Sequence, residues 1–287
     1  MAEVDYKELK KGGFMKQVQK DRFSLRLKAV GGYLTAEQLG KIQDVAQKYG
    51  QGYIHLTSRQ SVEIPFIRLE DVEAVKNELA AGGLEPGVCG PRVRTITACQ
   101  GRALCVHGLI DTTDLVKEFD QRYGGRELPH KFKLGITGCR NNCLKAEEND
   151  LGVKGGVLPE WEKNKCNFCG LCEAICPAKA ITVNKQGQDL GFSQAACNYC
   201  GRCVKACPVD AWNGKSGFIV FFGGLFGNRI AIGKQLLPII FERDDLHKVI
   251  ETTLAFFAKH GKQSERFGNT LERVGWNLLE SELAEVL

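Results

Sequence analysis

The sequence lacks the features that mark membrane, secreted and nucleic-acid-binding proteins. Its most apolar stretch, GFIVFFGGLFG at 217–227, is too short to span a membrane and predicts a buried strand followed by a glycine-rich turn. The start, MAEVDYKELKKGG, has no apolar core and no small-residue cleavage site, so it predicts no signal peptide. No Lys/Arg-dense tract with interleaved aromatic residues is present, which disfavours nucleic-acid binding. We therefore expect a cytoplasmic protein that binds neither a membrane nor nucleic acid.

The chain also lacks a flavin or nicotinamide fingerprint, whereas it is rich in cysteine. Thirteen cysteines occur among its 287 residues, and twelve of them are clustered. A cytoplasmic location and this clustering both disfavour disulfides, so metal binding is the better account of the cysteines. The formal net charge of +5 is moderate, and it ignores any bound cofactor.

Residue periodicity predicts a mixture of strands and helices. Strands are expected at 23–30, 53–56, 61–67, 93–98, 131–137 and 218–222, and helices at 70–81, at 111–123 and in a tail containing Leu246, Val249, Ile250 and Leu254. Thr35 and Gln38 have the spacing of a capping box, so a further helix starts there and ends at Gly50. Pro65 indicates that its strand ends or lies at an edge. The segment VKGGVLPEWEKNK at 153–165 is typical of a linker, and the whole pattern predicts an α+β fold.

Eight cysteines form a doubled pattern. CNFCGLCEAICP at 166–177 and CNYCGRCVKACP at 197–208 each match the bacterial two-cluster ferredoxin run, in which the fourth cysteine of each run binds the other cluster. The pattern predicts one cluster held by Cys166, Cys169, Cys172 and Cys207, and another held by Cys197, Cys200, Cys203 and Cys176. Because both prolines are present, two zinc sites are disfavoured. The module predicts electron transfer without indicating where the electrons go.

Four further cysteines occur as two pairs outside this module. Cys99 and Cys105 lie in TACQGRALC, and Cys139 and Cys143 lie in TGCRNNC. Four thiolates can bind a third iron–sulfur cluster, and chemistry alone leaves a structural zinc site as the alternative. The remaining cysteine, Cys89, is assigned no role, because free cysteines are often small buried hydrophobic residues.

The two pairs resemble the signature of the siroheme-dependent sulfite and nitrite reductases. RLKAVGGYLTAEQL and HLTSRQSVEI resemble the ferredoxin-like half-domain of that family, and the likeness spans about residues 20–155. The inserted ferredoxin module and the ending ERFGNTLERVGW are similar to the catalytic subunit of anaerobic and dissimilatory-type sulfite reductases. One position departs from the family pattern, since Arg140 stands where proline often follows the third cysteine. An added cation there is expected to raise the potential of the cluster.

The resemblance implies the cofactors and the site residues. It implies siroheme and three 4Fe–4S clusters, with Cys143 bridging its cluster to the siroheme iron and with Thr57, Arg59 and Gln60 at the siroheme. The anion-binding set of the family falls on Arg59, Arg94, Lys131 and Lys133, and alternation along a strand puts the two lysines on one face. His107 and His130 are expected to be structural histidines.

The implied architecture is a ferredoxin-like sulfite/nitrite reductase half-domain (1–85), a siroheme and 4Fe–4S module (86–158), an inserted two-cluster ferredoxin domain (159–214) and a segment that completes the siroheme module (215–287). Only one copy of a doubled architecture is present, which implies a homodimer or a hetero-oligomer with a related subunit. The expected activity is six-electron reduction of sulfite to sulfide, fed by an external ferredoxin-like or flavoprotein donor. A siroheme nitrite reductase, a non-catalytic electron-transfer subunit and an enzyme acting on another anion or a tetrapyrrole are the alternatives.

Overall fold

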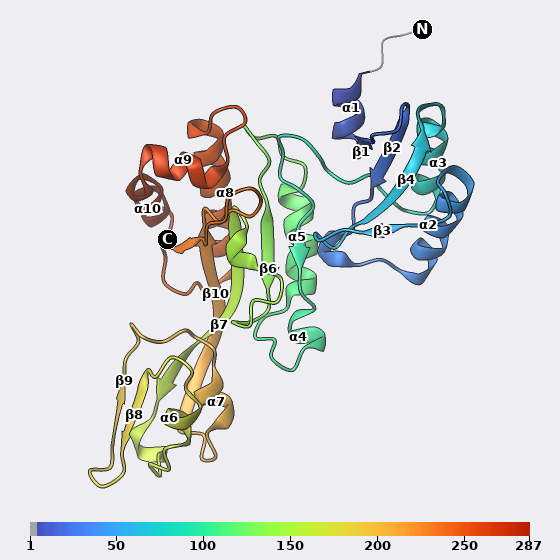
Figure 1. Cartoon of the computed structure of the whole chain (residues 1–287). Coiled ribbons are helices and arrows are strands. Elements are labelled where there is room, and N and C mark those ends of the chain that lie inside the picture. Colours follow the sequence, from blue (N-terminus) through green and yellow to red (C-terminus); the bar gives the residue numbers. More distant parts are fainter. Residues whose placement is uncertain (1–4) are drawn as a thin grey trace.

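The chain contains a four-stranded, a five-stranded and a two-stranded sheet, which lie in three successive regions (Figure 1). The computed structural model describes residues 5–287. None of the helices in that range combines the length and the apolar character needed to cross a membrane.

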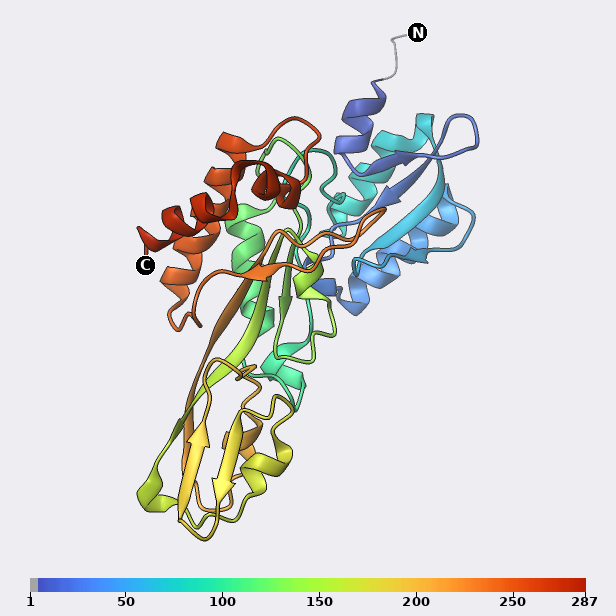
Figure 2. The same ribbon diagram turned by 60° about the vertical axis from the view of Figure 1, so that its left-hand side comes forward.

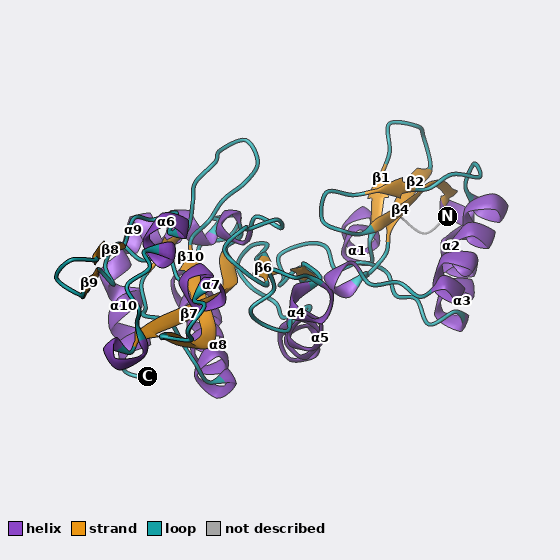
Figure 3. Ribbon diagram, turned by 90° about the horizontal axis from the view of Figure 1, so that it is seen from below, coloured by secondary structure: helices purple, strands orange, loops and turns teal. Residues whose placement is uncertain are grey.

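The first region is a sheet with two helices on one face (Figure 3). Its strands are β1 (Phe14–Lys16), β2 (Arg22–Arg26), β3 (His55–Leu56) and β4 (Val62–Arg68), in the order β1-β2-β4-β3, and its helices are α1 (Tyr6–Lys11), α2 (Ala36–Tyr49) and α3 (Val72–Ala81). Ile42 and Val45 of α2 and Leu79 of α3 are buried against Leu25 and Ile64 of the sheet. The apolar faces of α2 and α3 therefore close one side of the sheet.

Local sequence explains where α2 begins and ends. The Thr35 hydroxyl accepts a hydrogen bond from the Gln38 backbone N–H, and the Gln38 side chain accepts one from the Thr35 N–H. The predicted capping box is therefore confirmed, as is the end of the helix at Gly50. The strand predicted at 23–30 is shorter, because β2 ends at Arg26.

The prediction from Pro65 is wrong for the strand as a whole. β4 lies between β2 and β3 and continues to Arg68. Pro65 is tolerated because β3 pairs with β4 only as far as Glu63, and because the register between β2 and β4 shifts at this point. Phe66, with a φ of 68°, completes this bulge.

The second region is built on a five-stranded sheet in the order β11-β10-β7-β6-β5. Its strands are β5 (Thr97–Ala98), β6 (Leu134–Thr137), β7 (Leu151–Trp161), β10 (Trp212–Phe222) and β11 (Lys234–Gln235), and its helices are α4 (Gly101–Leu104), α5 (Thr112–Tyr123), α8 (Arg243–His260), α9 (Phe267–Val274) and α10 (Trp276–Ala284). The predicted helical tail is α8, with Leu246, Val249, Ile250 and Leu254 all buried. Helices α5, α8, α9 and α10 share one hydrophobic core with the sheet.

The linker predicted at 153–165 is wrong, because most of it belongs to β7. This strand pairs antiparallel with β10 along its whole length, from Leu151 opposite Phe222 to Trp161 opposite Trp212. The two strands run out of the five-stranded sheet as a ribbon that carries the third region at its end (Figure 2). The glycines that suggested a linker permit close packing, since a Cβ at Gly155 would lie 2.3 Å from the Gly138 carbonyl oxygen.

The third region is a small lobe with an internal repeat. It contains α6 (Leu171–Ile175), β8 (Ile181–Asn184), β9 (Asp189–Phe192) and α7 (Arg202–Ala206). Gly170 and Gly201 both have a positive φ and cap α6 and α7, and Phe168 and Tyr199 have φ values of 55° and 56°. The two cysteine runs of the sequence therefore fold into two copies of one backbone motif.

Candidate functional site

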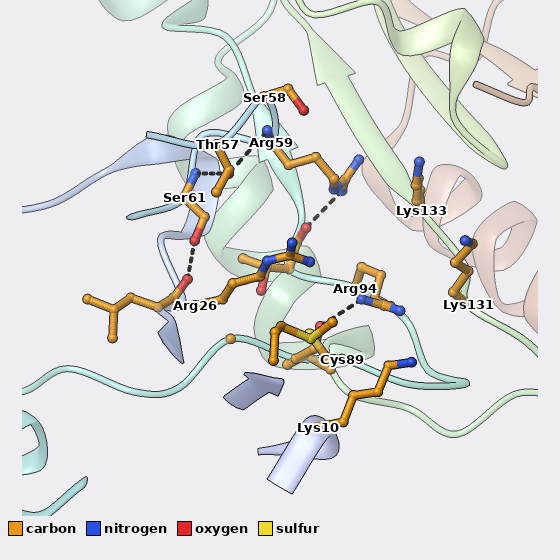
Figure 4. Close-up of a pocket in the computed structure, with 15 residues that line it drawn as sticks. Lys10, Arg26, Thr57, Ser58, Arg59, Ser61, Cys89, Arg94, Lys131 and Lys133 are labelled. Carbon is orange, nitrogen blue, oxygen red and sulfur yellow. Dashed lines mark hydrogen bonds between the residues drawn. The ribbon is translucent and has the colours of Figure 1, made fainter. Parts of the chain in front are cut away.

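Cationic side chains from three separated segments converge on a cavity of about 390 Å³ (Figure 4). Arg59, Arg94, Lys131 and Lys133 all line it, together with Thr57. None of the described residues that line it is acidic. Within residues 5–287, no carboxylate lies within ion-pair distance of those four cations. The cavity is therefore suited to hold an anion.

Arg59 lies in the turn between β3 and β4, and hydrogen bonds fix its position. The Thr57 hydroxyl accepts hydrogen bonds from the backbone N–H groups of Arg59 and Ser61, which closes the turn. The Arg59 guanidinium donates to the Asn149 side chain at 3.1 Å and to the Thr95 carbonyl at 3.0 Å. Both acceptors belong to the second region, so this arginine joins the half-domain to the rest of the chain.

Gln60, expected at the siroheme, is not among the residues that line the cavity. Its carboxamide pairs with the backbone of Ala98 in β5, donating to the carbonyl at 2.9 Å and accepting from the N–H at 3.0 Å. This places Gln60 as a bridge between the half-domain and the residue that precedes Cys99. The sequence alone does not distinguish such a bridge from a cofactor contact.

Lys131 and Lys133 lie in the extended segment that leads into β6. Behind them the Asp150 carboxylate is fully buried, and it accepts a hydrogen bond from the Lys133 backbone N–H at 2.8 Å. Arg266, at the start of α9, donates two further hydrogen bonds to the same carboxylate, at 3.2 Å and 2.7 Å. Asp150 thus holds in place the extended segment that carries the two lysines.

Burial and mutual repulsion lower the pKa values of these cations. Burial, followed by the charges of Arg59 and Arg266, lowers the pKa of Lys133 to about 8. The same kind of burial lowers the pKa of Arg59 to about 10 and also lowers that of Lys131. Lys133 is therefore the cation of this cavity that can release a proton near neutral pH.

Sequence reasoning missed several residues of this cavity. Lys10 of α1 and Arg26 of β2 line it, although Arg26 is paired with Glu63. Cys89 is buried, lines the cavity and lies close to Arg94 (Figure 4). No sequence signal connects these residues, because they come from segments that only the tertiary fold brings together.

A second, more open cavity of about 700 Å³ adjoins the first. Lys10, Arg94 and Lys131 line both cavities, and none of the described residues that line the second is acidic. His130 also lines it, and burial together with Lys131 lowers the pKa of His130. His107, by contrast, is exposed. The cationic surface therefore extends from the first cavity outward.

The four cysteines outside the lobe come together at the edge of the second region. Cys99 follows β5, Cys105 follows α4, and Cys139 and Cys143 follow β6. The Cys99 sulfur accepts a hydrogen bond from the Gly138 backbone N–H at 3.0 Å. Burial raises the pKa of Cys139, and the other three cysteines raise it further, so all four lie close together. Cys105 and Cys143 are exposed.

The eight cysteines of the lobe line two separate cavities. One is lined by Cys166, Cys169, Cys172 and Cys207, and the other by Cys176, Cys197, Cys200 and Cys203. These are the two sets that the doubled pattern predicts, each formed by three cysteines of one run and the last of the other. Among the described residues, no three His, Cys, Asp or Glu side chains form a group for a single metal ion.

The donor set and the backbone fit iron–sulfur clusters. Backbone N–H groups point at the sulfurs of Cys166, Cys176, Cys197 and Cys207, at 3.2–3.4 Å. Burial raises the pKa of Cys203 to about 12, so an anionic thiolate there needs a bound cation. Cavities enclosed by four sulfurs with amide donors around them suit a cluster of iron and sulfide.

Comparison with known proteins identifies the family. Residues 89–287 match the nitrite and sulphite reductase 4Fe-4S domain, and residues 15–82 match the nitrite/sulfite reductase ferredoxin-like half domain. The chain belongs to the nitrite and sulfite reductase family. Members of this family bind siroheme and a 4Fe–4S cluster.

Curated relatives of this chain include enzymes named for sulfite and enzymes named for nitrite. The chain is 33% identical over 279 residues to the coenzyme F420-dependent sulfite reductase of Methanocaldococcus jannaschii, covering 96% of this chain and 44% of that protein. It is 33% identical over 165 residues to a subunit of the anaerobic sulfite reductase of Salmonella typhimurium, covering 53% and 48%. It is also 34% identical over 142 residues to the nitrite reductase [NAD(P)H] large subunit of Klebsiella oxytoca, covering 49% and 15%. The chain thus spans less than half the length of each of these three relatives.

A solved structure shows the same fold. Dissimilatory sulfite reductase I superposes with a TM-score of 0.74 at 22% identity, covering 92% of this chain and 69% of that one. The expected α+β fold, with a ferredoxin-like half-domain and a 4Fe–4S domain, is therefore confirmed.

Proposed function

We propose that this chain is the siroheme- and iron–sulfur-dependent part of a sulfite reductase, which reduces sulfite to sulfide with six electrons. The observation that carries the proposal is the carboxylate-free cavity lined by Arg59, Arg94, Lys131 and Lys133, in a chain of this family. A non-catalytic electron-transfer subunit binds no substrate anion and would not need such a cavity. Siroheme, when bound, supplies the iron at which the anion is reduced.

The residues of the chain have separate tasks in this proposal. The guanidinium groups of Arg59 and Arg94 and the ammonium group of Lys131 attract and orient the oxyanion. Lys133 has a pKa of about 8, so its Nζ is suited to deliver protons to oxygen as it leaves. Asp150 and Arg266 act behind them by fixing the Lys133 backbone.

Electrons enter through the lobe, which we propose is a two-cluster ferredoxin domain inserted between β7 and β10. The two four-cysteine cavities of the lobe would each hold a 4Fe–4S cluster, and Cys99, Cys105, Cys139 and Cys143 would hold the third, with Cys143 also serving as a ligand for siroheme. The donor is an external ferredoxin-like or flavoprotein partner. The four segments 1–85, 86–158, 159–214 and 215–287 are the proposed modules; residues 1–4 of the first lie outside the described residues.

The proposed enzyme is a dimer, with itself or with a related subunit, whose active site is shared. Cys99, Cys105, Cys139 and Cys143 are not among the described residues that line the cationic cavity. This separation supports a cavity that faces siroheme bound by the partner chain. Mixing an inactive Arg94→Ala chain with an inactive Cys143→Ala chain tests this. Mixed dimers regain part of the activity if the site is shared, and stay inactive if each chain has its own site.

Steady-state reduction with reduced methyl viologen as the electron donor tests the activity. The proposal expects sulfite to be converted to sulfide with a higher kcat/KM than nitrite is converted to ammonia. A higher kcat/KM on nitrite would favour the second candidate, a siroheme nitrite reductase, for which the Klebsiella oxytoca relative is the supporting observation. Siroheme-loaded protein that reduces neither anion would contradict both functions, whereas protein that takes up the clusters but no siroheme would favour an electron-transfer subunit.

A further inference from the structure

The four cysteines of the second region lie against one of the two cysteine cavities of the lobe. Cys139 packs with Leu109, with Val157 of β7 and with Val204 of α7. The Val157 backbone N–H donates to the Tyr199 carbonyl at 2.9 Å. Val204 follows Cys203, and Tyr199 lies between Cys197 and Cys200. The cavity lined by Cys176, Cys197, Cys200 and Cys203 is therefore the proximal one, and that lined by Cys166, Cys169, Cys172 and Cys207 is the distal one.

Two cations and one carboxylate occupy the junction between the central cysteines and the proximal cavity. The Lys154 side chain is 2% exposed, and its ammonium lies 2.5 Å from a carboxylate oxygen of Glu147. The Arg140 guanidinium lies 3.9 Å from the same oxygen, and its Nε is buried without a hydrogen-bond partner. Two positive charges thus share one negative charge, which leaves the group with an excess positive charge.

Arg140 is close to both cysteine sets. It directly follows Cys139 in the chain, and its guanidinium carbon lies 6.0 Å from the centre of the Phe221 ring. Phe221 packs in one hydrophobic cluster with Tyr199, which lies within the second cysteine run. A single guanidinium therefore lies next to the central set and packs toward the proximal set.

The charges around the distal cavity differ from those at the junction. None of the described residues that line this cavity carries a charge, although the exposed Lys185 approaches Gly170 there. The proximal cavity is lined by one charged residue, Arg202, which is exposed and therefore screened by water. The two cavities of the lobe are copies of one motif, so the half-buried charges of the junction are what distinguishes their electrostatic surroundings.

We propose that Arg140 is a shared cation that raises the reduction potentials of both the central and the proximal cluster, so that electrons collect next to siroheme. This rests on the proposed function, because it requires the clusters to be present. Each reduction adds one electron from the external donor to a cluster, and no bond forms or breaks. The added negative charge would be stabilised by the half-buried Arg140 guanidinium, which lies near both cysteine sets. Glu147 limits this effect by neutralising part of the charge.

Anaerobic redox titration followed by electron paramagnetic resonance tests the proposal on the holoprotein. In Arg140→Gln, the potentials of the central and proximal clusters are expected to fall, while that of the distal cluster stays the same. Arg140→Lys is expected to stay close to the wild type. Glu147→Gln, which removes the compensating charge, is expected to shift the same two potentials upward, so the sign of the effect is tested by a second variant. Arg202→Gln is the matched control and changes at most the proximal cluster.

Several results would overturn the proposal. Unmoved potentials in both Arg140→Gln and Glu147→Gln would show that the junction charges do not act on the clusters. An equal shift of all three clusters would show a general effect of net charge. In both cases the proposed function would stand, because the clusters are present. A wild-type protein without cluster signals after anaerobic reconstitution would instead overturn the proposed function, and this inference with it.

Discussion

Positive charge is concentrated both in the cationic cavity and at the junction beside Cys139, but the two sites differ in whether a carboxylate neutralises it. Around the cavity, Arg59, Arg94, Lys131 and Lys133 have no carboxylate within ion-pair distance among residues 5–287. At the junction, Arg140 and Lys154 share the Glu147 carboxylate. The first site leaves its cations free, and the second neutralises part of them.

This difference matches what each site has to hold. A substrate anion arrives from water, so a site that binds it needs cations that are accessible and uncompensated. A cluster is built into the protein, and cations beside it set its potential without binding anything from solution. The Asp150 carboxylate lies behind the lysines and is fully buried, so it stabilises the segment that carries them without lining the cavity.

Removing the Asp150 charge should have the largest effect. Asp150→Ala leaves Arg266 without its buried partner and the Lys133 backbone N–H without an acceptor. We expect a loss of about 3–5 kcal/mol in the free energy of unfolding, measured by urea denaturation. Asp245→Ala, which breaks a more exposed pair with Lys248, is the control and should cost less than about 1 kcal/mol. Equal losses would show that Asp150 does not organise the cavity.

Removing a free cation should act on catalysis and leave stability nearly unchanged. Lys131→Ala is expected to lower kcat/KM for sulfite by about 10²–10³-fold, because the anion loses one of its fixed positive partners. Iron content and the unfolding midpoint should stay at wild-type values. Lys76→Ala, at a lysine that is paired with Glu73 on the half-domain, is the control. If both variants lose the same activity, the cavity does not bind the substrate.

The bridge through Gln60 should matter for stability and for the position of Arg59. Gln60→Ala leaves the Ala98 N–H and carbonyl unpaired, so we expect a loss of about 1–3 kcal/mol in the free energy of unfolding. KM for sulfite should rise, because Arg59 lies on the same turn. Gln51→Ala, at an exposed glutamine of the half-domain that does not line the cavity, is the control. An unchanged unfolding free energy would show that the bridge contributes nothing.

The pH dependence should reveal Lys133. Its pKa is lowered to about 8, so the side chain is charged below that pH and neutral above it. We expect kcat/KM, which reports the free enzyme, to fall roughly tenfold from pH 7 to pH 9 as the charge and the transferable proton are lost. In Lys133→Arg the charge persists over this range, so the fall should disappear, and comparing the two proteins removes the titration of sulfite itself. Parallel profiles would assign the pH dependence to another group.

The sequence predicted the parts that depend on local pattern. The capping box at Thr35, the helices α5 and α8 and the grouping of the eight lobe cysteines into two cavities all follow from spacing along the chain. The length of β7 did not, because Gly155, Gly156 and Pro159 look like linker residues until β10 pairs with them.

The rest of the candidate site depends on tertiary contacts that spacing does not show. Lys10 and Arg26 line the cationic cavity but lie far in sequence from Lys131 and Lys133. Arg266 is likewise distant in sequence from Asp150, and only the fold brings the two into hydrogen-bond contact. Gln60 was expected at the siroheme, and its hydrogen bonds to Ala98 across two regions could not be predicted from spacing. Likewise, Arg140 was an isolated departure from a family pattern until Glu147 and Lys154 placed it in a charged group.

The central claim is that the cationic cavity presents an anion to siroheme. The most direct test is the visible spectrum of anaerobically reconstituted protein, recorded during a titration with sulfite. The account predicts siroheme bands that sulfite perturbs at low concentration in the wild type, and at much higher concentration in Lys131→Ala, with cluster signals unchanged. Absence of siroheme bands after reconstitution, or identical sulfite titrations in the two proteins, would contradict it.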